Sequence, residues 1–392
     1  MKILFVHDHR FKSKGKDYYS NGSFPAKIWS RYLNAFDHLT VVGRDGGDLK
    51  ISESNFTLSS VESIDFSLFP NISNLKSLLF GNRAASTKCK QLVYEYDGVI
   101  ARLPSRMGQL FISEAIKQGK PYAIEVVGCA WDALWNHGSW KAKVVAPFAY
   151  YKTKKTVMDA PYALYVTQDF LQQRYPCRGK TTFCSNVEIA AVENDVLNQR
   201  NSKCRTSSEK IIFGLIGNYA SKYKGIDIAI RALSRVDAEL PDWEFQILGA
   251  GDSTEYAKLA ANLGIGDKVK FIGSLPSGEP VYRWLDNLNV YLQPSLTEGL
   301  PRALVEAMSR GCPALGSRVG GIPELLQPEQ MIKPGDYESL AEKISQIVQD
   351  RALLEKLSEE NFNKAKSYYK NILEGRRTAF WLSFKQYIQA KN

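Results

Sequence analysis

The sequence predicts an α/β fold with two parallel-sheet domains. Short apolar runs rich in β-branched and aromatic residues alternate with stretches of helical periodicity, and this alternation occurs in two series along the 392 residues. Between the series lies a polar stretch, residues 188–210, which is poor in large apolar side chains and is expected to be a linker. A chain of this length can form two cores, and such alternation favours parallel strands joined by crossover helices.

The first predicted domain covers residues 1–187. A helix is expected around residues 28–35, and the segment 52–87, rich in Ser and Asn, has a pattern that assigns it to no element. The expected strands are the apolar runs at residues 3–6, 39–42, 98–101, 122–127 and 162–166.

The second predicted domain covers residues 211–371. Apolar stripes between residues 340 and 357 predict two late helices, and residues 372–392 place large apolar side chains on one helical face. We therefore expect a terminal helix that packs on a core. The other expected elements are strands at 211–216, 243–248, 269–272 and 290–293, with helices at 226–236 and 256–263.

Composition narrows the class of protein. The net charge of +10 is compatible with a nucleic acid, an anionic membrane or an anionic substrate as partner. The first apolar run is four residues long, and no stretch approaches the roughly 18 to 20 apolar residues of a membrane span, so a cytoplasmic protein is expected. Six cysteines without a Cys-x-x-Cys pair are typical of reduced thiols. Four histidines without a His-Glu-x-x-His motif predict no protein-built metal site.

Two glutamates, Glu298 and Glu306, flank a predicted strand-to-helix turn. The turn follows the strand at 290–293, and Pro301 is expected at the first helical position. The helix should run for roughly ten residues and end at Gly311, which is placed for a left-handed cap. The free amides and positive dipole end of such a helix can hold a phosphate. Taken alone, the two acids could equally be solvated surface residues.

The segment around them resembles the signature of the retaining glycosyltransferases of family four. The family pattern is close to E-G-[FL]-P-x-x-x-x-E-A-M-x-x-G-x-P, and residues 298–313 match every fixed position. The resemblance covers residues 186–340 strongly and the first half weakly. It implies the GT-B fold, with two facing Rossmann-like domains, a cleft between them and a terminal helix that crosses back to the first domain. Expected partners are a nucleotide-diphosphate sugar donor and a glycan or lipid-linked acceptor.

The resemblance also implies roles for the matched residues. Glu298 would hold hydroxyls of the donor sugar near its anomeric carbon, and Glu306 would hold the ribose hydroxyls. Backbone amides around Gly299, Leu300 and Pro301 would contact sugar and phosphate, although proline itself has no amide to donate.

A second loop, Gly217 to Gly225, resembles the family element G-R-x-x-x-x-K-G. Lys224 matches its lysine and is the expected cation for the leaving phosphate, whereas Asn218 stands where the family has arginine. Lys222 or Arg302 could supply the second cation. An exposed first-turn residue is the alternative for Arg302. Because the chain contains no Asp-x-Asp pair, we expect a mechanism without a metal or other cofactor.

Weaker signals concern the remaining site residues. Gly22 precedes a predicted helix and is the candidate for the family's glycine loop near the donor phosphate, with a simple helix-entry glycine as the alternative. Asp132 and His137 are candidate acceptor-site residues. Gly249-Ala-Gly251 lacks the third glycine of a dinucleotide site, where Thr254 stands, so a nicotinamide enzyme is disfavoured.

The stretch Lys141 to Lys155 mixes lysines with apolar and aromatic residues. It suggests adsorption to the anionic inner face of the plasma membrane, with a helix flanked by solvated lysines as the alternative.

The sequence thus predicts a hexosyl-type retaining glycosyltransferase of polysaccharide or glycolipid assembly. A sugar-nucleotide epimerase or a phosphorylase of the same fold is the nearest rival. From another class, the charge allows a basic nucleic-acid-binding protein, but the sequence shows no recognition element or dense Arg/Lys run.

Overall fold

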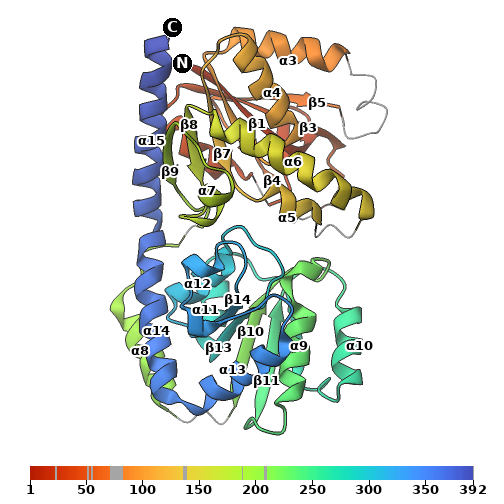
Figure 1. The fold of residues 1–392 in the computed structure, drawn as a ribbon, viewed down its shortest axis with the longest axis vertical. Coiled ribbons are helices and arrows are strands. Elements are labelled where there is room, and N and C mark those ends of the chain that lie inside the picture. Colours follow the sequence, from red (N-terminus) through yellow and green to blue (C-terminus); the bar gives the residue numbers. More distant parts are fainter. Residues whose placement is uncertain are drawn as a thin grey trace. The chain divides into compact units, whose positions relative to one another are not determined.

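The computed structural model divides the chain into two compact units (Figure 1). Unit 1 contains Met1–Cys184 and Glu374–Asn392, and unit 2 contains Ser185–Leu373. Each unit is described by itself. The residues that the structure describes are 1–22, 24–50, 53, 56–70, 83–135, 139–187, 189–206 and 210–391.

Unit 1 is built on a sheet whose parallel strands follow a doubly wound order. Along the sheet the order is β5, β3, β1, β6, β7, β8, β9, so the chain order reverses between β1 and β6. The bounds are β1 (Lys2–Lys14), β3 (His38–Asp48), β5 (Ile64–Phe69), β6 (Gly98–Leu103), β7 (Tyr122–Val126), β8 (Tyr162–Tyr165) and β9 (Lys180–Phe183).

Strand β1 is longer than its apolar run predicts. Ile3 to Val6 are fully buried between β3 and β6, as expected, but the strand continues to Lys14 through mostly polar residues, among which Phe11 is buried. This second half pairs with the end of β3 and, antiparallel, with β2 (Asp17–Ser20), which in turn pairs with β4 (Thr57–Leu58). A single buried apolar residue among polar ones does not predict a strand, so the sequence pattern does not mark this extension.

Helices cover this sheet, and the terminal helix α15 (Lys370–Lys391) is one of them from Glu374 onward. Its Phe380 and Phe384 pack on Tyr162, whose hydroxyl lies 3.0 Å from Ser383 Oγ. The other helices are η1 (Ala26–Trp29), α1 (Ser30–Leu33), α3 (Arg83–Glu95), α4 (Arg106–Lys117), α5 (Ala130–Trp135), α6 (Trp140–Met158) and α7 (Phe170–Arg174).

Unit 2 has a parallel sheet in the order β12, β11, β10, β13, β14, β15. The chain order reverses between β10 and β13, which is the Rossmann arrangement of strands. The bounds are β10 (Ile211–Ile216), β11 (Trp243–Leu248), β12 (Val269–Gly273), β13 (Val290–Gln293), β14 (Ala314–Ser317) and β15 (Met331–Ile332).

The helices of unit 2 follow the strands in alternation, as the sequence predicts. They are α8 (Asn194–Arg205), η2 (Lys222–Lys224), α9 (Ile226–Arg235), α10 (Thr254–Asn262), α11 (Glu279–Asn287), α12 (Arg302–Ser309), η3 (Ile322–Glu324), η4 (Pro328–Gln330), α13 (Tyr337–Gln349), α14 (Arg351–Ala365) and η5 (Lys366–Tyr368).

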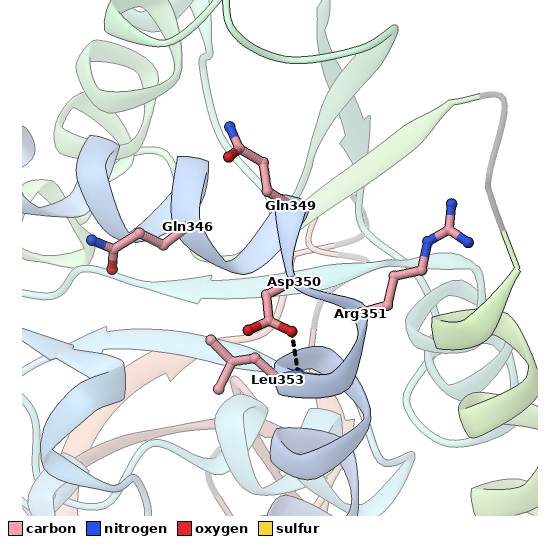
Figure 2. Close-up of a pocket in the computed structure, with 5 residues that line it drawn as sticks. All are labelled: Gln346, Gln349, Asp350, Arg351 and Leu353. Atoms are coloured by element: carbon pink, nitrogen blue, oxygen red, sulfur yellow. Dashed lines mark hydrogen bonds between the residues drawn. The ribbon is translucent and has the colours of Figure 1, made fainter.

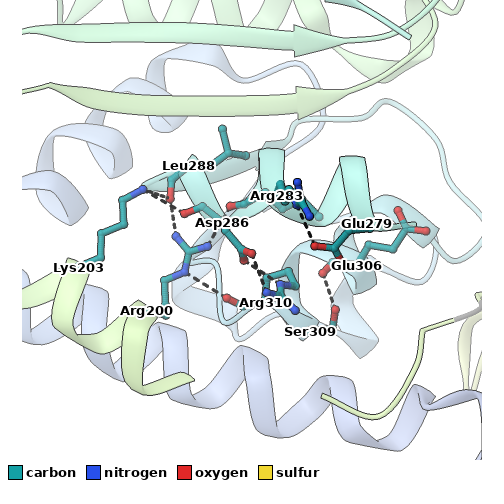
Figure 3. A network of polar contacts seen from close by, with 10 residues as sticks. Arg200, Lys203, Glu279, Arg283, Asp286, Leu288, Glu306, Ser309 and Arg310 are labelled. Atoms are coloured by element: carbon teal, nitrogen blue, oxygen red, sulfur yellow. Dashed lines mark hydrogen bonds and ion pairs between the residues drawn. The ribbon is translucent and has the colours of Figure 1, made fainter. Parts of the chain in front are cut away.

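Most of the stretch 188–210, which is expected to be a linker, forms helix α8 and belongs to unit 2. The polar composition of this stretch does not reveal the helix, because the buried face of α8 is itself mostly polar. Arg200 is only 4% exposed. Its guanidinium group donates to the backbone oxygens of Leu285, Leu288 and Arg310 (Figure 3). These carbonyls lie at the ends of α11 and α12, so α8 holds both helices.

Candidate functional site

The candidate site lies at the carboxyl ends of β10 and β13, where the strand order of unit 2 reverses. Ligands of doubly wound sheets bind at this switch point. The loop after β10 carries Lys224, and the loop after β13 carries Glu298. The two loops touch, because a Cβ added at Gly225 would lie 2.1 Å from the backbone oxygen of Pro294. Gly225 also has a φ of +72°, which glycine adopts without strain.

The structure brings Lys224 and Glu298 into direct contact. Lys224 Nζ lies 2.6 Å from Glu298 Oε1, and the two side chains are 20% and 9% exposed. Two further donors reach the same carboxylate oxygen: Ser295 Oγ at 3.0 Å and Gln293 Nε2 at 3.2 Å. One oxygen therefore receives three donors, and the orientation of the carboxylate is fixed from β13 on one side and η2 on the other.

Gln293 is held in turn by the strand that carries it. The Tyr291 hydroxyl donates to Gln293 Oε1 at 3.1 Å, and the amide of Ile216 in β10 donates to the same hydroxyl at 3.3 Å. Burial raises the pKa of Tyr291 far above its ordinary value, so the hydroxyl keeps its proton and remains a donor. The chain of contacts from Ile216 to Glu298 thus couples both strands of the switch point.

The turn after Glu298 is packed against the loop after β14. The amide of Gly321 donates to the Gly299 oxygen at 2.6 Å, and a Cβ on Gly320 would lie 2.0 Å from the oxygen of Glu298. This packing holds the backbone from Glu298 through Leu300 to Pro301. Helix α12 starts directly after it, and the first amides of any α-helix lack intrahelical acceptors.

Helix α12 is slightly shorter than predicted. It covers eight residues, with Pro301 as the N-cap residue at φ −72° and ψ 107° rather than at the first helical position. Pro301 has the extended backbone that the turn requires, so the helix begins one residue later. At the other end Gly311 has a φ of +61°, in agreement with the predicted left-handed cap.

Glu306 lies on α12, five residues into the helix, and is half-buried. Burial raises its pKa, and the charge of Arg302, one turn earlier, lowers it in part. The backbone oxygen of Glu306 accepts from Ser309 Oγ at 2.7 Å (Figure 3). The carboxylate is therefore a poorly solvated acceptor, and a ligand hydroxyl could satisfy it.

The structure distinguishes the residues considered as a second cation. Lys222 forms an exposed ion pair with Glu255 at 2.9 Å, on the η2 turn. Asn218 uses its side-chain oxygen to accept from the amide of Ala220, so it shapes the loop after Gly217. Arg302 is exposed in the first turn of α12. Lys222 therefore already has an acid partner, whereas Arg302 lies at the start of the helix that follows Glu298.

The remaining candidates lie in unit 1. Gly22 has a φ of +67° in the loop after β2, and a Cβ there would meet no atom within 4 Å. Asp132 Oδ1 lies 3.2 Å from Arg174 Nη1, an ion pair that links α5 to α7. His137 lies outside the described residues.

A cavity of unit 2 lies away from the candidate residues. The cavity in Figure 2 is lined by Gln346, Gln349, Asp350, Arg351 and Leu353, at the junction of α13 and α14, and includes none of the candidate residues. Among the described residues, no three His, Cys, Asp or Glu side chains are grouped as metal ligands. Nor does any described helix have the length and hydropathy to cross a membrane.

Sequence reasoning missed Gln293 and Ser295. Gln293 is the last residue of β13 and Ser295 lies two residues beyond it, and polar residues at the end of a buried strand beside a switch point are a recognisable signal. It also missed Arg200, whose partners are backbone oxygens from three distant positions that leave no trace in a sequence pattern.

The chain is similar in sequence to known proteins. The family model for glycosyl transferases group 1 matches residues 199–364. Protein CapJ of Staphylococcus aureus is 33% identical over 392 residues, with 99% of this chain and 97% of CapJ covered. The amylovoran biosynthesis glycosyltransferase AmsK of Erwinia amylovora is 35% identical over 139 residues, 33% of this chain and 34% of AmsK.

A solved structure, Anabaena Alr3699/HepE in complex with UDP-glucose, resembles the whole chain in fold. Its TM-score is 0.63 at 17% identity, with both chains covered completely. At this identity the likeness shows the fold alone, and that fold is GT-B, with two Rossmann-like α/β domains. Together with the full-length relative and the family model, these observations show that the chain belongs to the group 1 glycosyltransferases.

Proposed function

We propose that this glycosyltransferase transfers a hexose-type sugar, with retention of configuration, from a nucleotide-diphosphate sugar to a glycan or lipid-linked acceptor. The observation that carries the proposal is the Lys224–Glu298 pair at the switch point of unit 2, beside the start of α12. A cation, an oriented carboxylate and a helix N-terminus are the groups that departure of a sugar from a diphosphate requires.

In the proposed reaction, the bond between the anomeric carbon and the phosphate oxygen breaks. Lys224, Arg302 and the amides at the start of α12 stabilise the negative charge that develops on the phosphate. The acceptor oxygen forms its bond to the anomeric carbon on the same face, and its proton passes to the leaving phosphate. The charge stabilisation comes entirely from the protein, so the proposal needs no metal.

Lys224 can serve the phosphate while it remains bound to Glu298. Its ammonium group has three donors, and Glu298 uses one of them. Glu298 in turn has a second oxygen, Oε2, that is available in addition to the crowded Oε1. We assign this oxygen to the hydroxyls of the donor sugar. Glu306 is assigned to the ribose hydroxyls, and Gly217 and Gly22 to the close approach of backbone to the donor.

The named relatives support a role in polysaccharide assembly. AmsK is an amylovoran biosynthesis glycosyltransferase, and the Anabaena protein is solved with UDP-glucose. We infer that this chain uses a nucleotide sugar of the same type at the cytoplasmic side of the cell. The positive net charge then serves phosphate groups of the donor and of a membrane rather than a nucleic acid.

The test is a screen of nucleotide-diphosphate sugars, first for thermal stabilisation and then for turnover. The proposal predicts release of nucleoside diphosphate that depends on an added glycan or lipid-linked acceptor, with an α or β linkage that matches the donor. Conversion of the donor sugar without an acceptor would identify an epimerase. Turnover that requires inorganic phosphate would identify a phosphorylase, and salt-sensitive oligonucleotide binding without turnover would support a nucleic-acid-binding protein.

A further inference from the structure

Helix α6 of unit 1 has two apolar faces. One face packs on the unit: Ala146 and Val157 are fully buried, and Thr153 is nearly so. Tyr150 lies on this same side, and its hydroxyl donates to the Arg174 oxygen at 3.3 Å. These contacts of the inner face hold α6 on unit 1. The packing of the helix therefore does not require apolar residues on its opposite face.

The opposite face nevertheless carries large apolar side chains. Trp140, Val144, Phe148 and Tyr151 are 71%, 58%, 76% and 68% exposed. Their spacing of four, four and three residues places them in one stripe along the helix. Single exposed apolar residues are common on soluble proteins, whereas a continuous stripe marks an interaction surface. We call these four residues the outer face of α6.

The charged side chains of α6 itself have a single sign. The helix contains five lysines and no Asp or Glu in its 19 residues. Of these, Lys141, Lys152 and Lys155 are exposed and lie near the outer face by helical spacing. Long lysine side chains can extend from an apolar surface so that their ammonium groups reach anionic groups beside it.

We propose that the outer face of α6 binds the interfacial region of an anionic lipid bilayer, with the helix lying along the surface. Trp and Tyr favour the boundary between headgroups and acyl chains, and each lysine near an anionic leaflet adds about 1 kcal/mol of attraction. A second copy of the chain is a poorer occupant. A two-fold contact through this face would bring its three neighbouring lysines against three, without an acid on α6 to balance them.

The first experiment is flotation of the full chain with vesicles of phosphatidylcholine, with and without phosphatidylglycerol. The proposal predicts binding that needs the anionic lipid. It also predicts that Trp140→Ser/Phe148→Ser and Lys141→Gln/Lys152→Gln/Lys155→Gln each lower the partition coefficient about tenfold or more. Wild-type binding that is absent, or equal on both vesicles, would overturn it.

Matched controls separate this face from general apolar character and general charge. Tyr94→Ser removes an exposed aromatic residue of α3, and Lys258→Gln/Lys270→Gln/Lys333→Gln removes three exposed lysines of unit 2. Both controls should partition like the wild type. If the controls lose as much binding as the α6 variants, the attraction is not specific to α6 and the proposal fails.

Two other measurements exclude other occupants and a failure of the donor site. Sedimentation should show a self-association state that is the same in wild type and in Trp140→Ser/Phe148→Ser; a dimer that this variant abolishes would identify a second copy as the occupant. Thermal stabilisation by a nucleoside diphosphate should be unchanged in all α6 variants. The proposed function can therefore fail while this inference stands, and the reverse also holds.

Discussion

At the scale of single residues, the site depends on how its charges are solvated. Glu298 receives three donors on one carboxylate oxygen, which fixes the orientation of the side chain. Burial leaves Glu306 poorly solvated and raises its pKa above the ordinary value of 4.5. The two glutamates that look equivalent in the sequence thus have different electrostatic surroundings, which fits a reacting-sugar role for one and a nucleotide role for the other.

The first prediction concerns Glu306→Gln. A carboxyl whose pKa is raised on folding adds stability only at low pH, and that contribution is lost as the pH rises through the folded pKa. At pH 7 the ionised Glu306 therefore costs free energy, and the glutamine variant should unfold at higher urea concentration than the wild type. The difference should shrink as the pH falls toward 4.5, the ordinary value. Equal midpoints at pH 7 would contradict this account.

The same variant should bind nucleotide less well. A hydrogen bond to a charged group contributes about 1.5–3 kcal/mol, so loss of the carboxylate should weaken nucleoside diphosphate binding by about tenfold or more. Titration calorimetry measures the change. Glu255→Gln is the matched control. Glu255 is an exposed acid of unit 2, and neither it nor its partner Lys222 is assigned to the donor in the proposed reaction.

At the scale of elements, the loop of η2 depends on Gly225. Its φ is +72° and a Cβ would approach the Pro294 oxygen to 2.1 Å, so Gly225→Ala must move the loop that carries Lys224. We expect a loss of more than about 2 kcal/mol in the free energy of unfolding. Gly264→Ala is the control: its φ is +77° but no atom lies within 4 Å of the added Cβ, so only about 1 kcal/mol should be lost.

Helix α8 provides a second prediction at this scale. Arg200→Ala would remove the guanidinium that donates to the oxygens of Leu285, Leu288 and Arg310, although Lys203 Nζ still donates to the Leu288 oxygen at 3.1 Å. The loss should lower the free energy of unfolding, measured in urea, by about 1–3 kcal/mol. Arg205→Ala, on the same helix, removes an exposed pair with Glu355 and should cost less than about 1 kcal/mol. Similar losses in the two variants would show that α8 does not hold α11 and α12 as described.

At the scale of the whole molecule, much of the fold could be predicted from the sequence. Buried strands such as β10 and β13 appear as apolar runs, and α9 and α15 appear as periodic stripes, because their periodicity reflects burial. The predictions differ from the structure where burial is polar or pairing lies at an edge. Helix α8 is held by the polar side chain of Arg200. Strand β2 pairs with the last residues of β1, beyond the apolar run at residues 3–6. No apolar pattern records either feature.

The candidate site, like the fold, could be predicted from the sequence only in part. Lys224 and Glu298 stand in sequence motifs, but they are 74 positions apart in the chain, and their 2.6 Å contact depends on how β11, β12 and β13 fold between them. Gln293 and Ser295 join them only because of strand order. The sequence therefore indicates which residues are candidates for the chemistry, whereas the topology determines which of them meet.

Two partly buried histidines, His7 and His9, make the free energy of unfolding of unit 1 depend on pH. Burial, followed by the charge of Arg102, lowers the pKa of His7 to about 3 and that of His9 to about 4. The unfolded chain then binds more protons below its ordinary histidine pKa of 6.5, so stability present above 6.5 is lost as the pH falls toward 4. In His9→Gln, the slope of the free energy of unfolding against pH should be smaller than in the wild type by at most about 1.4 kcal/mol per pH unit. An unchanged slope in urea unfolding from pH 6.5 to pH 4.5 would contradict this.

The central claim is that Lys224 and Glu298 act together on the donor sugar. The most direct measurement is the turnover of a nucleotide-diphosphate sugar with acceptor in Lys224→Ala and Glu298→Gln, with Lys222→Ala as the matched lysine control. We predict that kcat falls at least about a hundredfold in each site variant, while the fold persists and Lys222→Ala remains close to wild type. Near-normal turnover in either folded site variant would contradict the account.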